Sequence, residues 1–260
     1  MTGPALADRH IALAHRLADA AGAAIRPHFR QPIPIETKPD QTPVTLADRG
    51  AEQAIRDLLS REVPDHGVIG EEFGRDRSDA SHVWVIDPID GTKAFISGLP
   101  IFGTLIALLR DGVPVLGVMD QPISGERWIG AIGQPTLFNG RPTRTRGCAS
   151  IAQASGFATS PLQFGPADTE RFDRLRQTAR LLRYGTDCYG CGMMVLGFAD
   201  FWIEAPLKLY DFAALVPIVQ GAGGLITDWR GQPLGMQSDG RVLASGDPAL
   251  HRAVIGLLAA

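Results

Sequence analysis

The chain has 260 residues, of which 45% are hydrophobic and 20% are charged, and its formal net charge is −3 at pH 7. This balance is typical of a globular protein with a sizeable core, and it argues against a strongly basic nucleic-acid-binding or membrane-surface protein. The first residues lack the basic and apolar pattern of a signal peptide, and no apolar run reaches the roughly 18 residues of a membrane span. We therefore expect a soluble, cytoplasmic protein with no nucleic-acid or membrane partner.

Apolar residues at helical spacing predict an amphipathic helix over residues 5–29. Prolines break the chain after it, and Thr45 can cap a second helix that runs to about residue 62. Apolar runs then predict a series of strands, with Asp111-Gly112 as a hairpin turn. The expected strands are Val68–Gly70, Val83–Ile86, Phe102–Leu109, Val113–Asp120 and Arg127–Ile132.

A polar break at residues 139–148 predicts the boundary between an N-terminal α+β lobe, residues 1–138, and a C-terminal α/β lobe, residues 139–260. Strands and helices alternate beyond it, so the fold class is mixed α and β. The expected helices are Thr169–Leu182, Gly190–Phe198 and Asp211–Gly221, and the expected strands are Ala154–Ala158, Phe201–Ala205 and Gly224–Thr227.

Cysteine and histidine give weak signals. Three cysteines are too few for a disulfide framework. Cys188 and Cys191 form a C-x-x-C pair, but a zinc site needs about four ligands and no second Cys or His pair lies nearby in the sequence. Packing in the core is the favoured interpretation, with a redox or zinc role as the alternative. The six histidines are scattered, and we expect most of them at the surface.

The run Trp84–Thr92 carries the strongest chemical signal. An apolar strand delivers Asp87 to its end, and a proline and a glycine turn the chain so that Asp90 comes back beside it. Adjacent carboxylates repel each other unless a hard cation lies between them, and Mg²⁺ takes oxygen ligands and suits phosphate chemistry. The backbone N–H groups that open a short helix at Thr92–Ile96 would provide a phosphate site.

Three further acids are placed to join this pair, namely Glu71 at the end of the preceding strand, Asp48 at the end of the run Val44–Asp48, and Asp211 at the start of a predicted helix. Helix capping or solvation is the simpler explanation of Asp48 or Asp211 taken singly, but the whole set favours a metal cluster. The spacing D-x-x-D-G-T differs from the D-x-D-G-T of phosphatases with an aspartyl nucleophile. The glycine-rich segments match neither a dinucleotide-binding motif nor a P-loop.

These motifs together make the chain resemble the inositol monophosphatase family of Mg²⁺-dependent, lithium-sensitive phosphatases. The resemblance runs in order through Lys38, Val44–Asp48, Gly70–Glu72, Asp87–Thr92 and Tyr210–Ala214. The family's second motif has Trp where Tyr210 stands and Gly where Leu215 stands. Within the family, the segments Ile89–Gly98, Phe102–Leu109, Tyr184–Tyr189 and Tyr210–Pro217 look like the histidinol-phosphatase branch.

The resemblance implies a layered α/β/α/β/α sandwich, a homodimer and two to three Mg²⁺ ions per active site. Glu71, Asp87 and the carbonyl of Ile89 would hold one ion. Asp87, Asp90 and Asp211 would hold a second, and a third, weaker ion would use Glu71.

The same resemblance assigns the groups that act on water and phosphate. Asp48 and Thr92 would orient and polarise the attacking water, and Glu71 would act with them as a catalytic residue. The amides of Gly91 and Thr92 would bind the phosphate. Because the attacking group is water, no covalent phosphoenzyme is expected.

Two acids further along the chain are expected to select a cationic substrate. Glu204 matches a family position that contacts the organic part of the substrate. Asp187 ends the run Gly185-Thr186-Asp187, where inositol-type members carry a small apolar residue in place of the carboxylate. Gly185, Thr186 and Asp187 are all candidate substrate-binding residues. A carboxylate there suits an ammonium or imidazolium better than neutral hydroxyls. The alternative is that Asp187 pairs with Arg183 or another base and only shapes the pocket.

The resulting functional hypothesis is a phosphatase that hydrolyses the small phosphomonoester histidinol phosphate, a step of histidine biosynthesis. The enzymatic alternative is an inositol monophosphatase or a broad-specificity phosphatase. A catalytically silent interaction protein of the same fold is the alternative outside enzymes.

Overall fold

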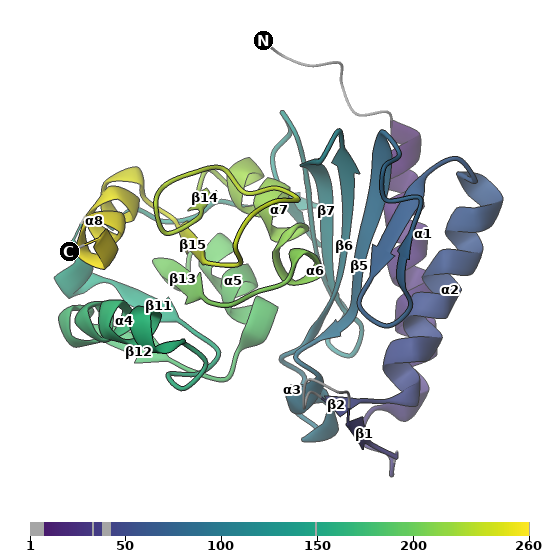
Figure 1. The fold of residues 1–260 in the computed structure, drawn as a ribbon, viewed down its shortest axis with the longest axis horizontal. Coiled ribbons are helices and arrows are strands. Elements are labelled where there is room, and N and C mark those ends of the chain that lie inside the picture. Colours follow the sequence, from purple (N-terminus) through teal and green to yellow (C-terminus); the bar gives the residue numbers. More distant parts are fainter. Residues whose placement is uncertain (1–7, 33, 38–42, 149, 260) are drawn as a thin grey trace.

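The computed structural model describes residues 8–32, 34–37, 43–148 and 150–259, so Lys38 lies outside the described residues. Figure 1 shows the elements stacked in layers, and this is the predicted α/β/α/β/α sandwich. The helices are α1 (Asp8–Ile25), η1 (Arg26–His28), α2 (Leu46–Glu62), α3 (Thr92–Ile96), η2 (Ile151–Gln153), α4 (Pro166–Thr178), α5 (Asp187–Val195), α6 (Leu209–Phe212), α7 (Leu215–Gly221) and α8 (Pro248–Ala259). None of these described helices combines the length and apolar character needed to cross a membrane.

The larger sheet has the strand order β10-β9-β8-β7-β6-β5-β3-β4. All of its neighbouring strands are antiparallel except β3 and β5, which run parallel. Its strands are β3 (Gly67–Gly70), β4 (Gly74–Asp76), β5 (His82–Asp90), β6 (Gly103–Arg110), β7 (Val113–Gln121), β8 (Glu126–Ala131), β9 (Leu137–Phe138) and β10 (Arg141–Pro142). A separate two-stranded sheet joins β1 (Glu36–Thr37) to β2 (Pro43–Val44).

Both faces of the larger sheet are covered by helices, and the sequence of β5 explains why. Successive side chains of a strand point to opposite faces, and here both sets are apolar. Val83 and Val85 pack in the core toward α5 and α7, whereas Trp84 and Ile86 pack in the core against α1 and α2. In Figure 1, α1 and α2 lie on one side of this sheet and α5, α6 and α7 on the other.

The smaller sheet has the strand order β12-β11-β13-β15-β14 and lies on the far side of α5, with α4 and α8 covering its outer face (Figure 1). Its strands are β11 (Ser155–Phe157), β12 (Leu181–Arg183), β13 (Phe201–Glu204), β14 (Leu225–Thr227) and β15 (Val242–Ser245). The predicted helix Thr169–Leu182 is therefore wrong at its end. α4 stops at Thr178, and the next residues leave the helix because β12 pairs in parallel with β11.

The predicted helix Asp211–Gly221 is also corrected, because the structure divides it into α6 and α7. Pro217 has no N–H group to donate to the carbonyl of Ala213, so the regular helical ladder is interrupted there. The carbonyl of Ala214 packs on Gly117 of β7, where a Cβ atom would lie only 1.9 Å from that oxygen. α7 is thus pressed directly onto the larger sheet.

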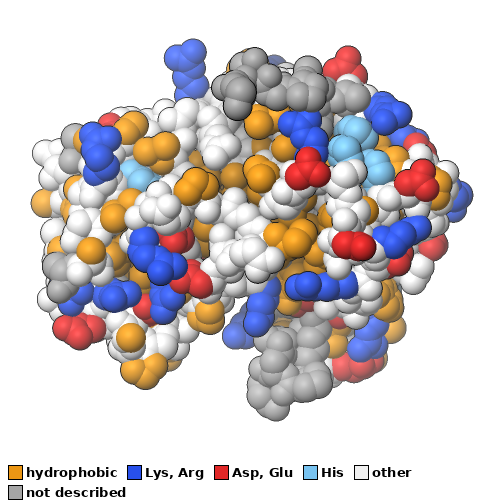
Figure 2. Space-filling model, turned by 45° about the horizontal axis from the view of Figure 1, so that its top comes forward, with side chains coloured by type: hydrophobic (Ala, Val, Ile, Leu, Met, Phe, Trp, Pro, Cys, Tyr) orange, Lys and Arg blue, Asp and Glu red, His pale blue; other side chains and the backbone are white. Residues whose placement is uncertain are grey.

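The expectation that most histidines lie at the surface is wrong for His10 and His251, which are 5% and 3% exposed. The rings of His10, His66 and His82 lie 5.0, 5.5 and 5.8 Å apart, because the start of α1, the loop before β3 and the start of β5 meet there. Figure 2 shows histidine side chains gathered at one place on the surface, and it shows Lys and Arg interspersed with Asp and Glu.

The larger sheet lies within residues 67–142 and the smaller one within residues 155–245. The lobe boundary at 139–148 nevertheless stays a prediction, because α7, from the second half of the chain, packs on β7 and β8. Cys188 and Cys191 are buried in the core that α5 forms with the larger sheet, as their favoured interpretation requires.

Candidate active site

Asp87 and Asp90 reach the same site because β5 contains a bulge. In the ladder with β6, Asp87 lies opposite Leu105 and Asp90 lies opposite Gly103, so three steps along β5 match two steps along β6. Residues three apart on a regular strand point to opposite faces, and the extra residue of a bulge changes this alternation. The irregularity that Pro88 introduces therefore allows both carboxylates to face one space.

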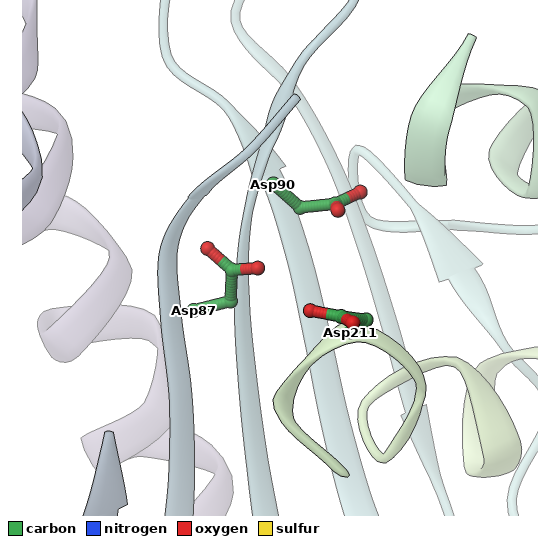
Figure 3. Close-up of side chains that lie close together, drawn as sticks. All are labelled: Asp87, Asp90 and Asp211. Atoms are coloured by element: carbon green, nitrogen blue, oxygen red, sulfur yellow. The ribbon is translucent and has the colours of Figure 1, made fainter. Parts of the chain in front are cut away.

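The third member of the cluster, Asp211, comes from α6. Its Oδ2 atom accepts a hydrogen bond from the backbone N–H of Lys208 at 2.6 Å, which fixes the side chain at the start of the helix. Carboxylate oxygens of Asp87, Asp90 and Asp211 lie within 4.8 Å of one another. Figure 3 shows the three side chains surrounding a common space at the end of β5.

Glu71 joins this group from the end of β3. Its backbone N–H donates to the carbonyl of Ile86 at 3.2 Å, which continues the parallel pairing of β3 with β5. A hydrogen bond also joins the side chains of Glu71 and Asp87. Two acids can form such a bond only when they share a proton, so a cation would replace that proton at neutral pH.

Burial and mutual repulsion act together on these acids. Burial, followed by the charges of Glu71, Asp90 and Asp211, raises the pKa of Asp87 well above its usual range. Burial, followed by Asp187 and Asp211, does the same to the pKa of Asp90. Burial raises the pKa of Asp211 to about 7. The donors are all carboxylate oxygens, the type that Mg²⁺ prefers, so the residues fit such an ion.

Asp48 lies behind the cluster and is held by two threonines. Its Oδ2 atom accepts hydrogen bonds from the N–H and hydroxyl groups of Thr45, at 2.8 and 2.6 Å, in the capping box that begins α2. Its Oδ1 atom lies 3.3 Å from the hydroxyl of Thr92, which is also 3.1 Å from the carbonyl of Ile89. Burial is the main cause that raises the pKa of Asp48.

Gly91 connects β5 to α3 with a φ of +95°, a conformation that favours glycine. A Cβ atom at this position would lie 3.0 Å from Oδ2 of Asp187 and 3.2 Å from Cβ of Phe102. A side chain here would therefore be strained and would crowd the space in front of Asp187.

Asp187 and Glu204 form a second acidic group beside the first. Glu204 is 1% exposed, and its Oε1 atom accepts from the N–H and hydroxyl groups of Thr159 at 2.6 and 2.9 Å. Its Oε2 atom contacts the side-chain amide of Gln163. Thr159 also hydrogen bonds to Asp187. Burial raises the pKa of Asp187 to about 6, against the opposing effect of Lys93, and raises the pKa of Glu204 to about 8.

A cavity of about 290 Å³ joins the two acidic groups. The predicted residues that line it are Glu71, Asp87, Ile89, Asp90, Gly91, Thr92, Asp187, Glu204 and Asp211. Asp48 is not among the lining residues and reaches the cavity only through Thr92. Gly185 and Thr186 do not line it either, because the N–H of Gly185 bonds to the carbonyl of Thr159 and Thr186 is largely buried. A direct role for these two in substrate binding stays a prediction.

The cavity also contains residues that the sequence did not single out as site residues, namely Lys93, Thr159, Gln163, Cys188 and Lys208. Lys93 and Cys188 directly follow the predicted site residues Thr92 and Asp187, so the sequence could have identified them as neighbours of the site. Thr159 and Gln163 lie in a loop after β11 with no motif around them, and only the tertiary fold brings them to Glu204.

Comparison with known proteins identifies the family of this chain. Residues 7–260 match the profile of the inositol monophosphatase family. The chain is 44% identical over 254 residues to the bifunctional phosphatase IMPL2, chloroplastic, of Arabidopsis thaliana, covering 94% of this chain and 73% of that protein. It is 38% identical over 250 residues to the histidinol-phosphatase of Chlorobaculum parvum, covering 95% of each. A solved inositol monophosphatase from Zymomonas mobilis is 49% identical, with a TM-score of 0.91 over 97% of this chain and 98% of that one.

Proposed function

Because this chain belongs to the inositol monophosphatase family and is a phosphatase, we propose that it hydrolyses L-histidinol phosphate to L-histidinol and phosphate, with Mg²⁺ as cofactor. The observation that carries the choice of substrate is the carboxylate of Asp187, which lies in the same cavity as the Asp87, Asp90 and Asp211 cluster. The similarity to a protein named histidinol-phosphatase supports the same choice.

The carboxylates of the cluster would hold two to three Mg²⁺ ions. Glu71, Asp87 and the carbonyl of Ile89 would bind one ion, and Asp87, Asp90 and Asp211 would bind a second. A third, weaker ion would use Glu71. Bound Mg²⁺ would activate the attacking water and stabilise the leaving alkoxide.

Asp48 and Thr92 are arranged to take a proton from that water. The hydroxyl of Thr92 lies between Asp48 and the cavity, so it can accept a hydrogen bond from water while it donates its own proton to Oδ1 of Asp48. Burial raises the pKa of Asp48 and so makes its carboxylate a stronger base than an exposed one. The amides of Gly91 and Thr92 would bind the phosphate, and water attacks directly with no covalent phosphoenzyme.

Of the two acids beside the cluster, Asp187 is the one that would recognise a cation. With a pKa of about 6 it is mostly ionised at neutral pH, whereas Glu204, with a pKa of about 8, is mostly protonated. Both oxygens of Glu204 also contact Thr159 or Gln163. Histidinol carries an ammonium group and an imidazole, and a charge-assisted hydrogen bond to Asp187 would favour it over a substrate with neutral hydroxyls.

An inositol monophosphatase is the second candidate, and the solved Zymomonas mobilis structure supports it. In that case the charge that acts on Asp187 in the cavity would be Lys93 rather than a substrate cation. Asp187 would then only shape the pocket, and the enzyme would accept inositol 1-phosphate or several small phosphomonoesters.

The test compares kcat/KM for histidinol phosphate and inositol 1-phosphate in wild type and in Asp187→Ala. We expect roughly a 10- to 150-fold loss for histidinol phosphate and little change or a gain for inositol 1-phosphate. Arg183→Ala is the matched control and should leave both values unchanged. Equal losses on both substrates would falsify the selective role of Asp187, and a wild type that prefers inositol 1-phosphate would support the second candidate.

Two properties implied by the family resemblance complete the proposal. Millimolar Li⁺ should inhibit phosphate release, and the protein should be a homodimer. Activity assays with lithium chloride against sodium chloride test the first, and the mass measured by light scattering in solution tests the second.

A further inference from the structure

Cys188 makes two hydrogen bonds to one carboxylate of the metal cluster. It is the second residue of α5, and its backbone N–H donates to Oδ2 of Asp90, 98 residues earlier, at 2.6 Å. Its thiol forms a second hydrogen bond with the same side chain. The backbone N–H and the thiol of Cys188 therefore both contact the carboxylate of Asp90.

The sulfur atom is held in place by the strand next to Asp90. Gly103 lies opposite Asp90 in the ladder between β5 and β6. A Cβ atom on Gly103 would lie 2.8 Å from Sγ of Cys188, so the sulfur packs against the bare Cα of this glycine. Because Cys188 is 1% exposed, its thiol has little room to turn away from Asp90.

Asp90 needs such hydrogen-bond donors because the neighbouring carboxylates repel its negative charge. Asp187 and Asp211 are the main negative charges that act on it. The bond from Cys188 fixes Oδ2, and in this orientation an oxygen of Asp90 lies within 4.8 Å of oxygens of Asp87 and Asp211. If the thiol bond were lost, only this backbone bond would oppose the repulsion that favours a rotation of the carboxylate away from the cluster.

We propose that Cys188 is a positioning residue that holds the carboxylate of Asp90 in its metal-binding orientation. This inference rests on the proposed Mg²⁺-dependent function. It also separates the two cysteines of the C-x-x-C pair. Cys188 contacts the site, whereas Cys191, three residues later and also buried, packs in the core of α5. The two cysteines of the pair therefore have different surroundings.

The experiment measures Mg²⁺ binding by titration calorimetry in the absence of substrate, so that it does not depend on activity. The variants are Cys188→Ala, Cys188→Ser and the control Cys191→Ala, each checked by thermal unfolding in EDTA. Cys188→Ala keeps the backbone bond to Asp90 and removes only the thiol bond. We expect it to weaken Mg²⁺ binding about tenfold, since hydrogen bonds to charged groups contribute on this scale. Cys188→Ser retains a donor and should stay within about threefold of wild type. Cys191→Ala should bind Mg²⁺ as wild type does.

Gly103→Ala provides a second approach if Cys188→Ala does not fold. The added methyl group would displace the sulfur from Asp90 while both Cys188 and Asp90 stay unsubstituted. Gly103→Ala should therefore weaken Mg²⁺ binding, as Cys188→Ala does. Wild-type affinity in the folded Cys188→Ala or Gly103→Ala variant overturns the positioning role, and so does an equal loss in Cys191→Ala. Either result leaves the proposed function intact, provided that wild type still binds Mg²⁺ and releases phosphate. A wild type that does neither overturns the proposed function together with this inference.

Discussion

The hydroxyl of Thr92 lies 3.3 Å from Oδ1 of Asp48, whose other oxygen caps α2 through Thr45. One buried carboxylate thus stands between a threonine that faces the cavity and a threonine that begins a helix. We propose a catalytic role for the side of Asp48 that faces Thr92, and the side that faces Thr45 belongs to the capping box of α2, so the two can be tested separately.

Thr92→Val should lower kcat by roughly 10²- to 10⁴-fold, because it removes the hydroxyl that links water to Asp48. Its free energy of unfolding should change little. Thr45→Ala removes the helix cap instead and should cost about 1 kcal/mol of stability. Steady-state kinetics and urea unfolding of both variants check this contrast. If Thr92→Val retained wild-type kcat, the proton path through Thr92 would be wrong.

Asp87→Asn should lose well over tenfold in kcat, which corresponds to more than ~1.4 kcal/mol of transition-state stabilisation. The amide keeps the size of the side chain but loses the charge that would contact two ions. The same change removes the repulsion from Glu71 and Asp90, so the metal-free variant should unfold at a higher temperature than metal-free wild type. Asp79→Asn, at an exposed acid outside the cavity, serves as the control. A folded Asp87→Asn that keeps more than about a tenth of wild-type turnover contradicts the metal assignment.

In EDTA, the free energy of unfolding should fall as the pH rises from about 4 to about 7. The pKa of Asp211 is about 7 in the folded protein against an ordinary value of 3.8, so the native state binds more protons than the unfolded state between these values. Asp211→Asn should reduce this slope. Mg²⁺ bound only to the native state should restore stability at pH 8 by mass action. A melting temperature that does not move in millimolar Mg²⁺ would count against the cluster.

His10→Leu should stabilise the protein, and most of all in acid. Both ring nitrogens of His10 are buried without a hydrogen-bond partner among the described residues, and burial lowers its pKa. The pKa of neighbouring His66 is lowered to about 4. The contribution of these two histidines to stability should therefore become less favourable as the pH drops from about 6.5 to about 4, opposite in sign to that of Asp211, because the unfolded chain binds protons that these histidines cannot.

Urea unfolding at pH 7.5 and pH 5.5 measures this effect. His10→Leu should gain about 1 kcal/mol or more at pH 5.5, since it removes an unsatisfied buried group. His28→Leu, at a partly exposed position of η1, is the control and should show no such gain. A loss of stability in His10→Leu at both pH values would indicate that its ring has a partner in solution.

Much of the fold and the centre of the site could be predicted because their signals are local. The helical spacing before residue 29, the cap at Thr45 and the Asp111-Gly112 turn each depend on a few neighbouring residues, and the structure confirms α1, α2 and the hairpin between β6 and β7. The spacing of Asp87 and Asp90 likewise predicted two carboxylates at one strand end. Residues close in sequence have few ways to be arranged, so composition and spacing determine the outcome.

Contacts between distant segments were decided by the tertiary structure alone. Leu181 and Leu182 end the helix predicted from the sequence but lie in β12, because β11 offers a parallel partner. Cys188 showed only a C-x-x-C spacing, yet α5 carries it to Asp90, 98 residues away. Thr159 lies in a loop without a motif and reaches Glu204 across 45 residues. Such pairings depend on how whole layers pack. The packing energy that selects them comes from many residues, so it cannot be inferred from the two residues that meet.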